Sequence, residues 1–292
     1  MASNGADVVG DDDDRVPLLS RRREVGGGSS RSLLMMILGG FVLPFGEPVW
    51  TATLIRALGL LGVEERSARQ SLARTAADGW LASERVGRRV RWSVTDSGRH
   101  LLTAGTQRMY AFGSQEHTWD GRWFVILLSL PEPMRTLRHK LRTQLSWAGF
   151  GSPATGVWIS PHIASVTEAS RILEELELST EALCFIAEYH TLGISQQEMI
   201  AAAWDLADVE QRYEKFIAEF ADAAPENPND YFVSHIRLFH EWRRFPFLDP
   251  QLPRVLLPQQ WSGTTAKQVF QEKDALWREH ARRRWSELAA GQ

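Results

Sequence analysis

The order of structural signals in residues 31–112 limits this chain to few folds. Apolar residues recur with a helical period in three segments, and two segments with strand-like alternation follow. The five segments are residues 32–38, 48–61, 64–78, 81–85 and 89–95. Gly87 lies in the predicted turn between the two strands. Three helices followed by a hairpin is the order of a winged helix-turn-helix, so we predict a domain of this type over residues 31–112.

The limits of the predicted helices follow from glycine and proline. Gly39 and Gly40 are expected to end the first helix, because glycine weakens a helix interior. Pro48 is expected in the first turn of the second helix, where its missing N–H costs nothing. Gly79 is expected to end the third helix.

The third predicted helix has one apolar face and one face suited to reading bases. Its inward residues are expected to be Ala68, Leu72, Thr75 and Ala76. Arginine can donate two hydrogen bonds to guanine, and glutamine can pair with adenine. The residues of this helix predicted to contact DNA are Arg66, Ser67, Arg69, Gln70 and Arg74. An ordinary solvated arginine face is the alternative interpretation.

The predicted hairpin carries four arginines at or beside its turn: Arg85, Arg88, Arg89 and Arg91. Residues in such a hairpin reach phosphates or a minor groove. The charge of the chain supports this interpretation. Residues 31–110 contain 11 Arg and no Lys against 6 Asp and Glu, a net charge of +5, whereas the whole chain carries −3. A basic module on an acidic body is typical of a protein that meets a polyanion through one domain.

Several other classes of protein find little support. The longest apolar run, residues 33–44, is shorter than a membrane span and contains two glycines. The N-terminus is acidic and has no apolar signal core, so a cytoplasmic, nucleoid-associated location is expected. Cys184 is the single cysteine, and we expect it to be buried in a strand. His235 and His240 are five residues apart, so surface or capping roles are expected rather than metal ligation. We predict no catalytic, metal or cofactor site.

The remainder of the chain divides by composition into a tail and two further domains. Residues 1–30 contain an acidic run, an arginine run and a glycine-serine stretch, which predicts a disordered tail. Residues 113–192 alternate strand and helix patterns, which predicts a ferredoxin-like α/β domain, with residues 150–160 as a hairpin that would supply its fourth strand. Residues 193–292 are mainly helical. The predicted fold class is therefore an α+β multidomain protein.

The sequence resembles the PaaX family of regulators of bacterial phenylacetate degradation genes, over about residues 32–268. Five segments carry the resemblance: Ser67–Trp80 with its Arg69-x-x-Leu72-x-Arg74 core, Val86–Arg89, Trp119–Trp123, Leu145-x-Trp147-x-Gly149-Phe150-Gly151, and Asp249-Pro250-x-Leu252-Pro253-x-x-Leu256-Leu257-Pro258-x-x-Trp261-x-Gly263. The last segment is long and idiosyncratic, which makes the match specific.

The resemblance implies a homodimeric repressor that blocks promoters of a catabolic operon. It implies dimerisation through the middle domain, binding to a double-stranded DNA operator, and release by an acyl-CoA effector such as phenylacetyl-CoA. Arg243, Arg244 and Trp261 are the expected effector-binding residues.

Two other functions remain open at this point. The middle domain is also similar to that of small CRISPR-associated nucleases, which makes a divalent-metal-dependent nuclease the main alternative. Their first strand ends in a metal-binding aspartate, whereas this one ends Leu128-Ser129-Leu130-Pro131. A protein-interaction module that has lost DNA binding is the other alternative.

Overall fold

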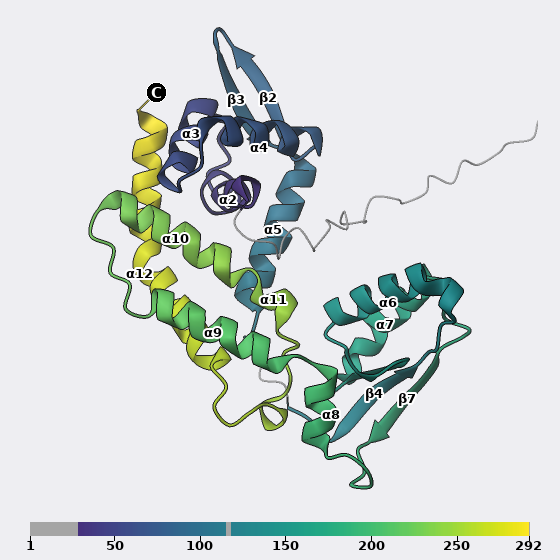
Figure 1. The fold of residues 1–292 in the computed structure, drawn as a ribbon. Coiled ribbons are helices and arrows are strands. Elements are labelled where there is room, and N and C mark those ends of the chain that lie inside the picture. Colours follow the sequence, from purple (N-terminus) through teal and green to yellow (C-terminus); the bar gives the residue numbers. More distant parts are fainter. Residues whose placement is uncertain (1–28, 115–117, 292) are drawn as a thin grey trace, which may run out of the picture.

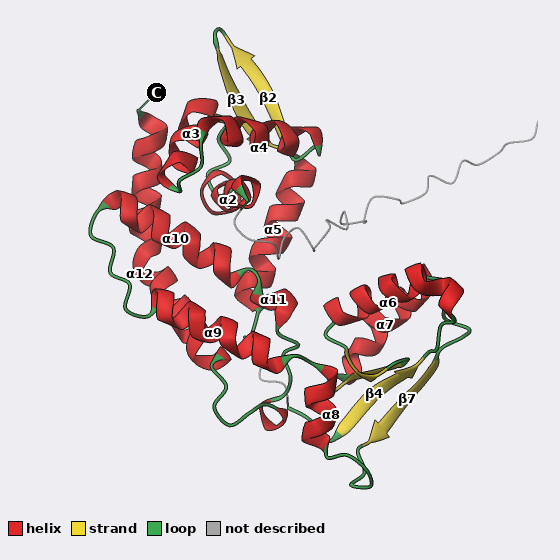
Figure 2. Cartoon of the chain, in the orientation of Figure 1, coloured by secondary structure: helices red, strands yellow, loops and turns green. Residues whose placement is uncertain are grey.

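The computed structural model describes residues 29–114 and 118–291. The predicted tail therefore lies outside the described residues, except for Ser29 and Ser30, which already cap and begin the first helix. The described chain has three parts: an N-terminal module, a middle unit built on a sheet, and a group of C-terminal helices (Figures 1 and 2). Among the described helices, none has the length and hydropathy needed to cross a bilayer.

The N-terminal module contains helices and a small sheet in the predicted order. Its elements are α2 (Ser30–Ile37), a π-helix (Leu38–Val42), β1 (Val49–Trp50), α3 (Thr51–Leu60), α4 (Glu65–Ala77), β2 (Leu81–Val86), β3 (Arg89–Val94) and α5 (Asp96–Ala111). The strands are antiparallel in the order β1-β3-β2. Helix α5 leaves the module toward the C-terminal helices (Figure 1).

Two helix limits predicted from the sequence are wrong. Gly39 and Gly40 do not end the first helix, because the chain continues through them as a π-helix whose Phe41 and Val42 are buried. Apolar burial on both sides of the glycines outweighs their low helix propensity. Pro48 does not lie in a helix either. The residue after it begins the short strand β1, which pairs with Trp92 of β3.

The middle unit is a four-stranded antiparallel sheet with two helices on one face. Its elements are β4 (Arg122–Leu127), a 3₁₀ turn (Glu132–Met134), α6 (Arg135–Trp147), β5 (Gly151–Ala154), β6 (Val157–Ser160), a 3₁₀ turn (Ile163–Ser165), α7 (Val166–Glu175) and β7 (Leu183–Glu188). The strand order is β5-β6-β4-β7. The suggested hairpin of residues 150–160 is present as β5 and β6. Helices α6 and α7 bury Leu141, Leu145 and Ile172 against the sheet.

The C-terminal helices begin at the sheet and end beside the N-terminal module. They are α8 (Gln196–Ala203), α9 (Leu206–Phe220), α10 (Pro228–Trp242), α11 (Phe245–Leu248), a 3₁₀ turn (Arg254–Leu256) and α12 (Gly263–Ala290). Ile200 of α8 joins Trp123, Ile159 and Leu252 in a core on the second face of the sheet. The indole of Trp204 donates to the carbonyl oxygen of Gly149 at 3.2 Å.

The N-terminal module and the C-terminal helices share one apolar core. Phe41 lies 5.1 Å from Phe232 of α10 and 5.8 Å from Trp285 of α12, measured between ring centroids. Leu34 and Ile236 are buried in the same cluster. Each fully buried aromatic or aliphatic side chain contributes roughly 1.5–3 kcal/mol. The module is therefore held to the C-terminal helices by apolar packing.

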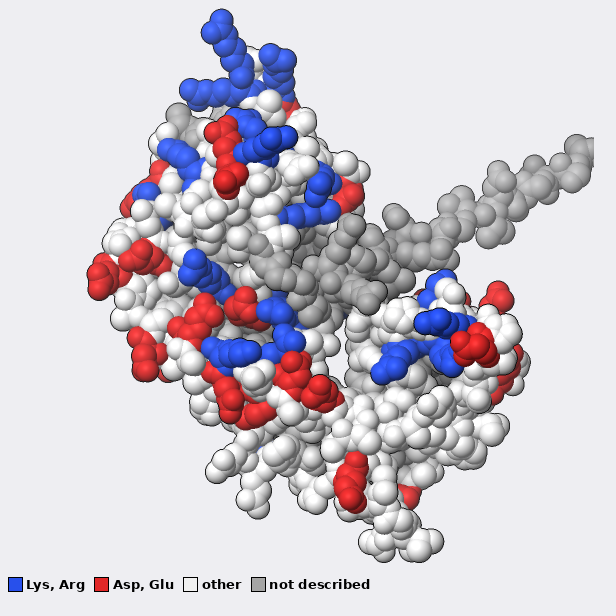
Figure 3. Space-filling view, in the orientation of Figure 1, with Lys and Arg blue, Asp and Glu red and all other residues white. Residues whose placement is uncertain are grey.

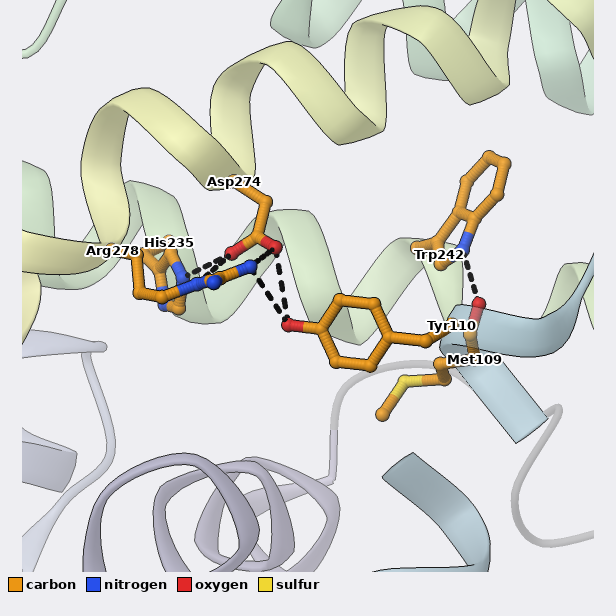
Figure 4. A network of polar contacts seen from close by, with 6 residues as sticks. All are labelled: Met109, Tyr110, His235, Trp242, Asp274 and Arg278. Carbon is orange, nitrogen blue, oxygen red and sulfur yellow. Dashed lines mark hydrogen bonds and ion pairs between the residues drawn. The ribbon is translucent and has the colours of Figure 1, made fainter. Parts of the chain in front are cut away.

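A polar network centred on the buried Asp274 joins the same two parts at the end of α5 (Figure 4). Asp274 of α12 accepts hydrogen bonds from His235 Nε2 at 3.0 Å, from the Tyr110 hydroxyl at 3.1 Å and from Arg278 Nε at 3.2 Å. Trp242 donates from its indole to the carbonyl oxygen of Met109 at 3.2 Å. The end of α5 is thus bonded to both α10 and α12.

The two histidines are placed differently from the expectation. His235 and His240 are both buried rather than on the surface. The ring of His235 also packs on Phe239, with 4.8 Å between ring centroids. The residues that cover this side of α10 lie far from His235 in the sequence. The sequence therefore did not reveal that this side of the helix is buried.

The surroundings of this network shift the pKa values of its members, among them Asp274 and Tyr110. Burial opposes the charge of Asp274, but the hydrogen bonds from His235 and Arg278 outweigh it and lower the pKa of Asp274 below its ordinary 3.8. Burial and the charge of Asp274 raise the pKa of Tyr110 to about 12, so the phenol remains a neutral donor. In the network Asp274 is therefore a charged carboxylate, and its partners are hydrogen-bond donors.

We predict a pH-dependent cost for Asp274→Asn. A carboxylate with a lowered folded-state pKa stabilises the fold above its unfolded-state pKa, and this contribution is lost as the pH falls through the folded-state value. The substitution should lower the free energy of unfolding by about 1.5–3 kcal/mol at neutral pH. The difference should shrink below pH about 4.

Urea unfolding of both proteins across this pH range measures the difference. Exposed Asp222→Asn is the matched control and should change the free energy of unfolding by less than about 0.5 kcal/mol. A cost for Asp274→Asn that is constant down to pH about 2 would show that the charge of Asp274 does not stabilise the fold.

Candidate nucleic-acid interface

Helix α4 is fixed in the module by its inward face. Ala68, Leu72 and Thr75 are fully buried, as the sequence predicts, whereas Ala76 is only half-buried. Ser71 is buried as well, and its hydroxyl lies 2.7 Å from that of Ser30 in α2. The spacing of Ser71 fits the inward stripe, but a hydroxyl gives no apolar signal.

The outward face of α4 presents three polar side chains in a row. Arg66, Gln70 and Arg74 are exposed, and among the described residues none of the three makes a side-chain hydrogen bond or ion pair. The other two predicted contact residues differ from them. Ser67 is half-buried, and Arg69 pairs with Glu65 at 2.7 Å one turn earlier. Arg66, Gln70 and Arg74 are therefore the free hydrogen-bonding groups of this helix.

The hairpin of β2 and β3 projects beyond the helices, with α4 at its base (Figure 1). Val86 pairs with Arg89, which leaves Gly87 and Arg88 in a two-residue turn. Gly87 has φ +61°, a conformation that glycine adopts without strain. Arg88 is exposed at this turn. The hairpin thus holds a cation far from the body of the module.

The other three hairpin arginines have contacts within the hairpin or with β1. Arg85 Nε donates to the carbonyl oxygen of Gly87 at 3.2 Å, and the Arg89 guanidinium lies 5.9 Å from the Trp50 ring. Arg91 forms an ion pair with Glu84 at 2.8 Å. This hydrogen-bonded pair lowers the pKa of Glu84 and raises the pKa of Arg91.

Short polar contacts hold the hairpin against the helices. Thr51 at the start of α3 donates to the carbonyl oxygen of Val90 at 2.9 Å and accepts from the Trp92 indole at 2.8 Å. Gly98 in α5 lies so close to Trp80 that a Cβ there would be 2.3 Å from the Trp80 carbonyl oxygen. The module therefore presents α4 and the hairpin in a fixed relation.

Positive charge gathers over this part of the molecule. On the face drawn in Figure 3, Lys and Arg cover the projecting hairpin and the region of α4. Lys and Arg alternate with Asp and Glu over the C-terminal helices below. The module is thus suited to contact an extended anion, and the C-terminal helices are not.

Of the three predicted effector-binding residues, Arg244 lines a cavity, whereas Arg243 and Trp261 are not part of its lining. This cavity of about 250 Å³ lies among the C-terminal helices α9, α10 and α11. Its lining residues are Asp208, Gln211, Arg212, Lys215, Phe216, Glu219, Glu241, Arg244, Phe245 and Leu248. Arg244 pairs with Glu241 at 3.0 Å. Arg243 is buried, and Trp261 packs on Tyr213.

The middle unit differs from the expectation at its cysteine. Cys184 is exposed on β7 rather than buried, because β7 is an edge strand that α6 and α7 do not cover. Partial burial raises the pKa of the Cys184 thiol.

Within the described residues, no three His, Cys, Asp or Glu side chains are grouped so that they could hold a metal ion.

Comparison with known proteins gives a match for each of the three parts of the chain. Residues 29–98 match the family described as PaaX-like protein, residues 116–200 match the PaaX protein central Cas2-like domain, and residues 204–287 match the PaaX-like protein C-terminal domain. The transcriptional repressor PaaX of Escherichia coli (strain K12) is 32% identical over 235 residues, which are 77% of this chain and 72% of the repressor.

A solved structure has a similar fold. The uncharacterized protein Rv0674 from Mycobacterium tuberculosis superposes with a TM-score of 0.59 and 18% sequence identity, over 85% of this chain and 96% of that one. This likeness concerns the fold alone. The identity to the repressor and the three matching domains show that the chain belongs to the PaaX family.

Proposed function

We propose that this protein is a transcriptional repressor that binds a double-stranded DNA operator through α4 and the hairpin of β2 and β3. The observation that carries the proposal is the free, exposed row of Arg66, Gln70 and Arg74 beside a projecting arginine hairpin. The element order and the strand order β1-β3-β2 support a winged helix-turn-helix. The repressor name of the E. coli relative supports the same function.

The two elements have different roles in this proposal. Helix α4 enters the major groove, where Arg66 and Arg74 reach guanine and Gln70 reaches adenine. Its exposed Ala73 and Ala77 lie beside this row and leave room for a close approach to the groove. The hairpin lies along the backbone, where Arg88 meets a phosphate. Arg91 contributes less, because Glu84 already neutralises it.

We predict that three substitutions separate base reading from backbone contact. Arg74→Ala should cost roughly 1–3 kcal/mol of binding free energy on the operator and relax discrimination at one base pair. Gln70→Ala should change specificity but leave the salt dependence alone, because glutamine is neutral. Arg88→Ala should weaken binding to all duplexes and lower the slope of log affinity against log salt by about one unit.

The measurement is the affinity of the full chain for an operator selected in vitro and for random duplexes, over a salt series. Arg99→Ala, an exposed arginine on α5, is the matched control and should leave affinity and slope unchanged. Incubation with magnesium should leave the duplexes intact, whereas magnesium-dependent cleavage would favour the nuclease alternative. Unchanged affinity and specificity in both Arg74→Ala and Gln70→Ala would refute base reading by α4.

The proposed repressor is a homodimer formed through the ferredoxin-like middle domain. The strand order β5-β6-β4-β7, with both helices on one face, supports that fold. Strand β7 is an edge that exposes Leu183, Phe185 and Ile186, with 60%, 48% and 51% of their surfaces accessible. An apolar unpaired edge is a liability unless another chain covers it. We infer that β7 of a second copy covers this edge.

The dimer prediction is that Phe185→Glu produces a monomer. Two glutamates at a shared edge lose apolar burial and repel each other. Val255→Glu, at a residue that is 75% exposed in the C-terminal part, is the control and should stay dimeric. Sedimentation velocity of the full-length proteins distinguishes the two states. A Phe185→Glu protein that remains dimeric would place the interface elsewhere.

The proposed effector is an acyl-CoA bound at the cavity lined by Phe216 and Arg244. The cavity volume of about 250 Å³ suits an acyl group rather than a whole coenzyme. The lining places the cations Arg212, Lys215 and Arg244 among three carboxyl side chains, those of Asp208, Glu219 and Glu241. Phosphates of the ligand would compete for these cations.

The cavity is connected to the DNA-binding module by short contacts. Phe216 packs on Trp242 with 5.4 Å between ring centroids, and Trp242 donates to Met109 at the end of α5. A ligand can release DNA only if it binds the released state more tightly. We propose that this difference in affinity arises because the acyl group displaces the end of α10.

Phenylacetyl-CoA is the probe for this part of the proposal. We expect it to weaken operator binding at least about tenfold, which corresponds to about 1.4 kcal/mol. Arg244→Ala should lose this response but keep its operator affinity in the absence of ligand. If neither phenylacetyl-CoA nor other acyl-CoAs change operator affinity at millimolar concentration, effector release is wrong, whereas DNA binding is unaffected.

A further inference from the structure

The middle unit concentrates its positive charge on one helix. Residues 113–192 contain six Lys and Arg residues, of which four lie on the 13-residue helix α6. The same segment contains nine Asp and Glu residues, and none of them lies on α6. The segment is acidic as a whole, so the charge of α6 does not follow from its average composition.

Three of the four cations of α6 form a stripe along the helix. Arg135, Arg138 and Arg142 are spaced i, i+3 and i+7, which places them on one side of a helix. Leu141 and Leu145 are buried against the sheet on the adjoining side of the helix, next to the half-buried Arg138. The stripe is about 10 Å long at 1.5 Å per residue. Packing of the leucines therefore holds it outward on a rigid support.

Most of the stripe is not neutralised by neighbouring carboxylates. Arg138 pairs with Glu132 at 2.5 Å. Arg135 and Arg142 are exposed, and neither has an ion pair among the described residues. Helix α7 shows the contrasting arrangement, because its Arg171 lies between Glu168 and Glu175 and pairs with both.

Helix stability does not explain the stripe. Arg138 and Arg142 are like charges at i, i+4, which destabilise a helix. Arg135 is in the first turn, where a cation opposes the helix dipole, and this turn has no acidic residue. Both effects lower the stability of the folded helix. We therefore attribute the presence of these arginines to a partner with negative charge.

We propose that the α6 stripe contacts the phosphate backbone of duplex DNA beyond the base pairs that α4 reads. This rests on the proposed function of α4 and the hairpin. Lys and Arg over α6 lie on the same face of the molecule as those over the hairpin and α4 (Figure 3). The stripe supplies affinity that depends on salt but not on sequence. The middle unit is then part of the DNA-binding surface.

Duplex length and charge removal test the proposal in the full-length protein. The probes are random-sequence duplexes of about 20 and about 60 base pairs, titrated over a salt series. With the long duplex, Arg135→Gln/Arg142→Gln should lower the slope of log affinity against log salt by about 1.8 units, at about 0.9 per lost phosphate contact. With the short duplex the double variant should behave like the unsubstituted protein.

Two matched variants test whether the lower slope comes from the unpaired charges of α6. Arg171→Gln removes an already paired cation from α7 and should leave the slope unchanged on both duplexes. Arg135→Lys/Arg142→Lys keeps the charge and should restore the slope on the long duplex. Glutamine and lysine are good helix formers, so circular dichroism should show α6 intact in all of them.

The outcomes separate this proposal from the proposed function. If the unsubstituted protein binds the long duplex, Arg88→Ala lowers its slope and the α6 double variant does not, then only the α6 proposal is overturned. It is equally overturned if the double variant changes the sedimentation of the protein with an unchanged slope, because α6 would then contact a second copy. If the unsubstituted protein binds neither duplex, the proposed function itself fails.

Discussion

Phe41 lies where the N-terminal module meets the C-terminal helices, and its ring packs on Phe232 and Trp285. This contact depends on the π-helix that carries the chain through Gly39 and Gly40, because the π-helix buries Phe41. Without it, α2 would lose its support, and α4 packs on α2 in turn. The position of the arginine row therefore depends on aromatic packing of Phe41 on residues 191 and 244 positions further along the chain.

This arrangement makes the N-terminal module and the C-terminal helices one mechanical unit. The module is joined to α10 and α12 twice, by the apolar core and by the network of Asp274 with Tyr110, His235 and Arg278. The middle unit packs on α8 and accepts a hydrogen bond from Trp204, which follows that helix. A ligand among the C-terminal helices would thus act on a contact shared by the DNA-binding module and its support.

Local patterns in the sequence predicted much of the N-terminal module. The hairpin follows from Gly87 between two strand-like segments, and the inward face of α4 follows from the spacing of Ala68 and Leu72. The outward row of Arg66, Gln70 and Arg74 follows from the same spacing.

The features that the sequence did not reveal depend on partners far along the chain. β1 exists because β3 pairs with it, and Gly39 and Gly40 remain helical because distant aromatics cover Phe41. His235 is buried because Asp274 binds it, and Cys184 is exposed because β7 lies at an edge. The cavity beside Arg244 forms from three helices, so no single motif marks it.

Methylation interference tests the central claim most directly, because it reports which groove the protein reads. Dimethyl sulfate methylates guanine N7 in the major groove, where Arg66 and Arg74 are proposed to bind. For the full-length protein on its selected operator, we expect N7 methylation to block binding at two clusters of guanines about one helical turn (~34 Å) apart. Binding that tolerates N7 methylation throughout the operator would contradict the account, because α4 would then not occupy the major groove.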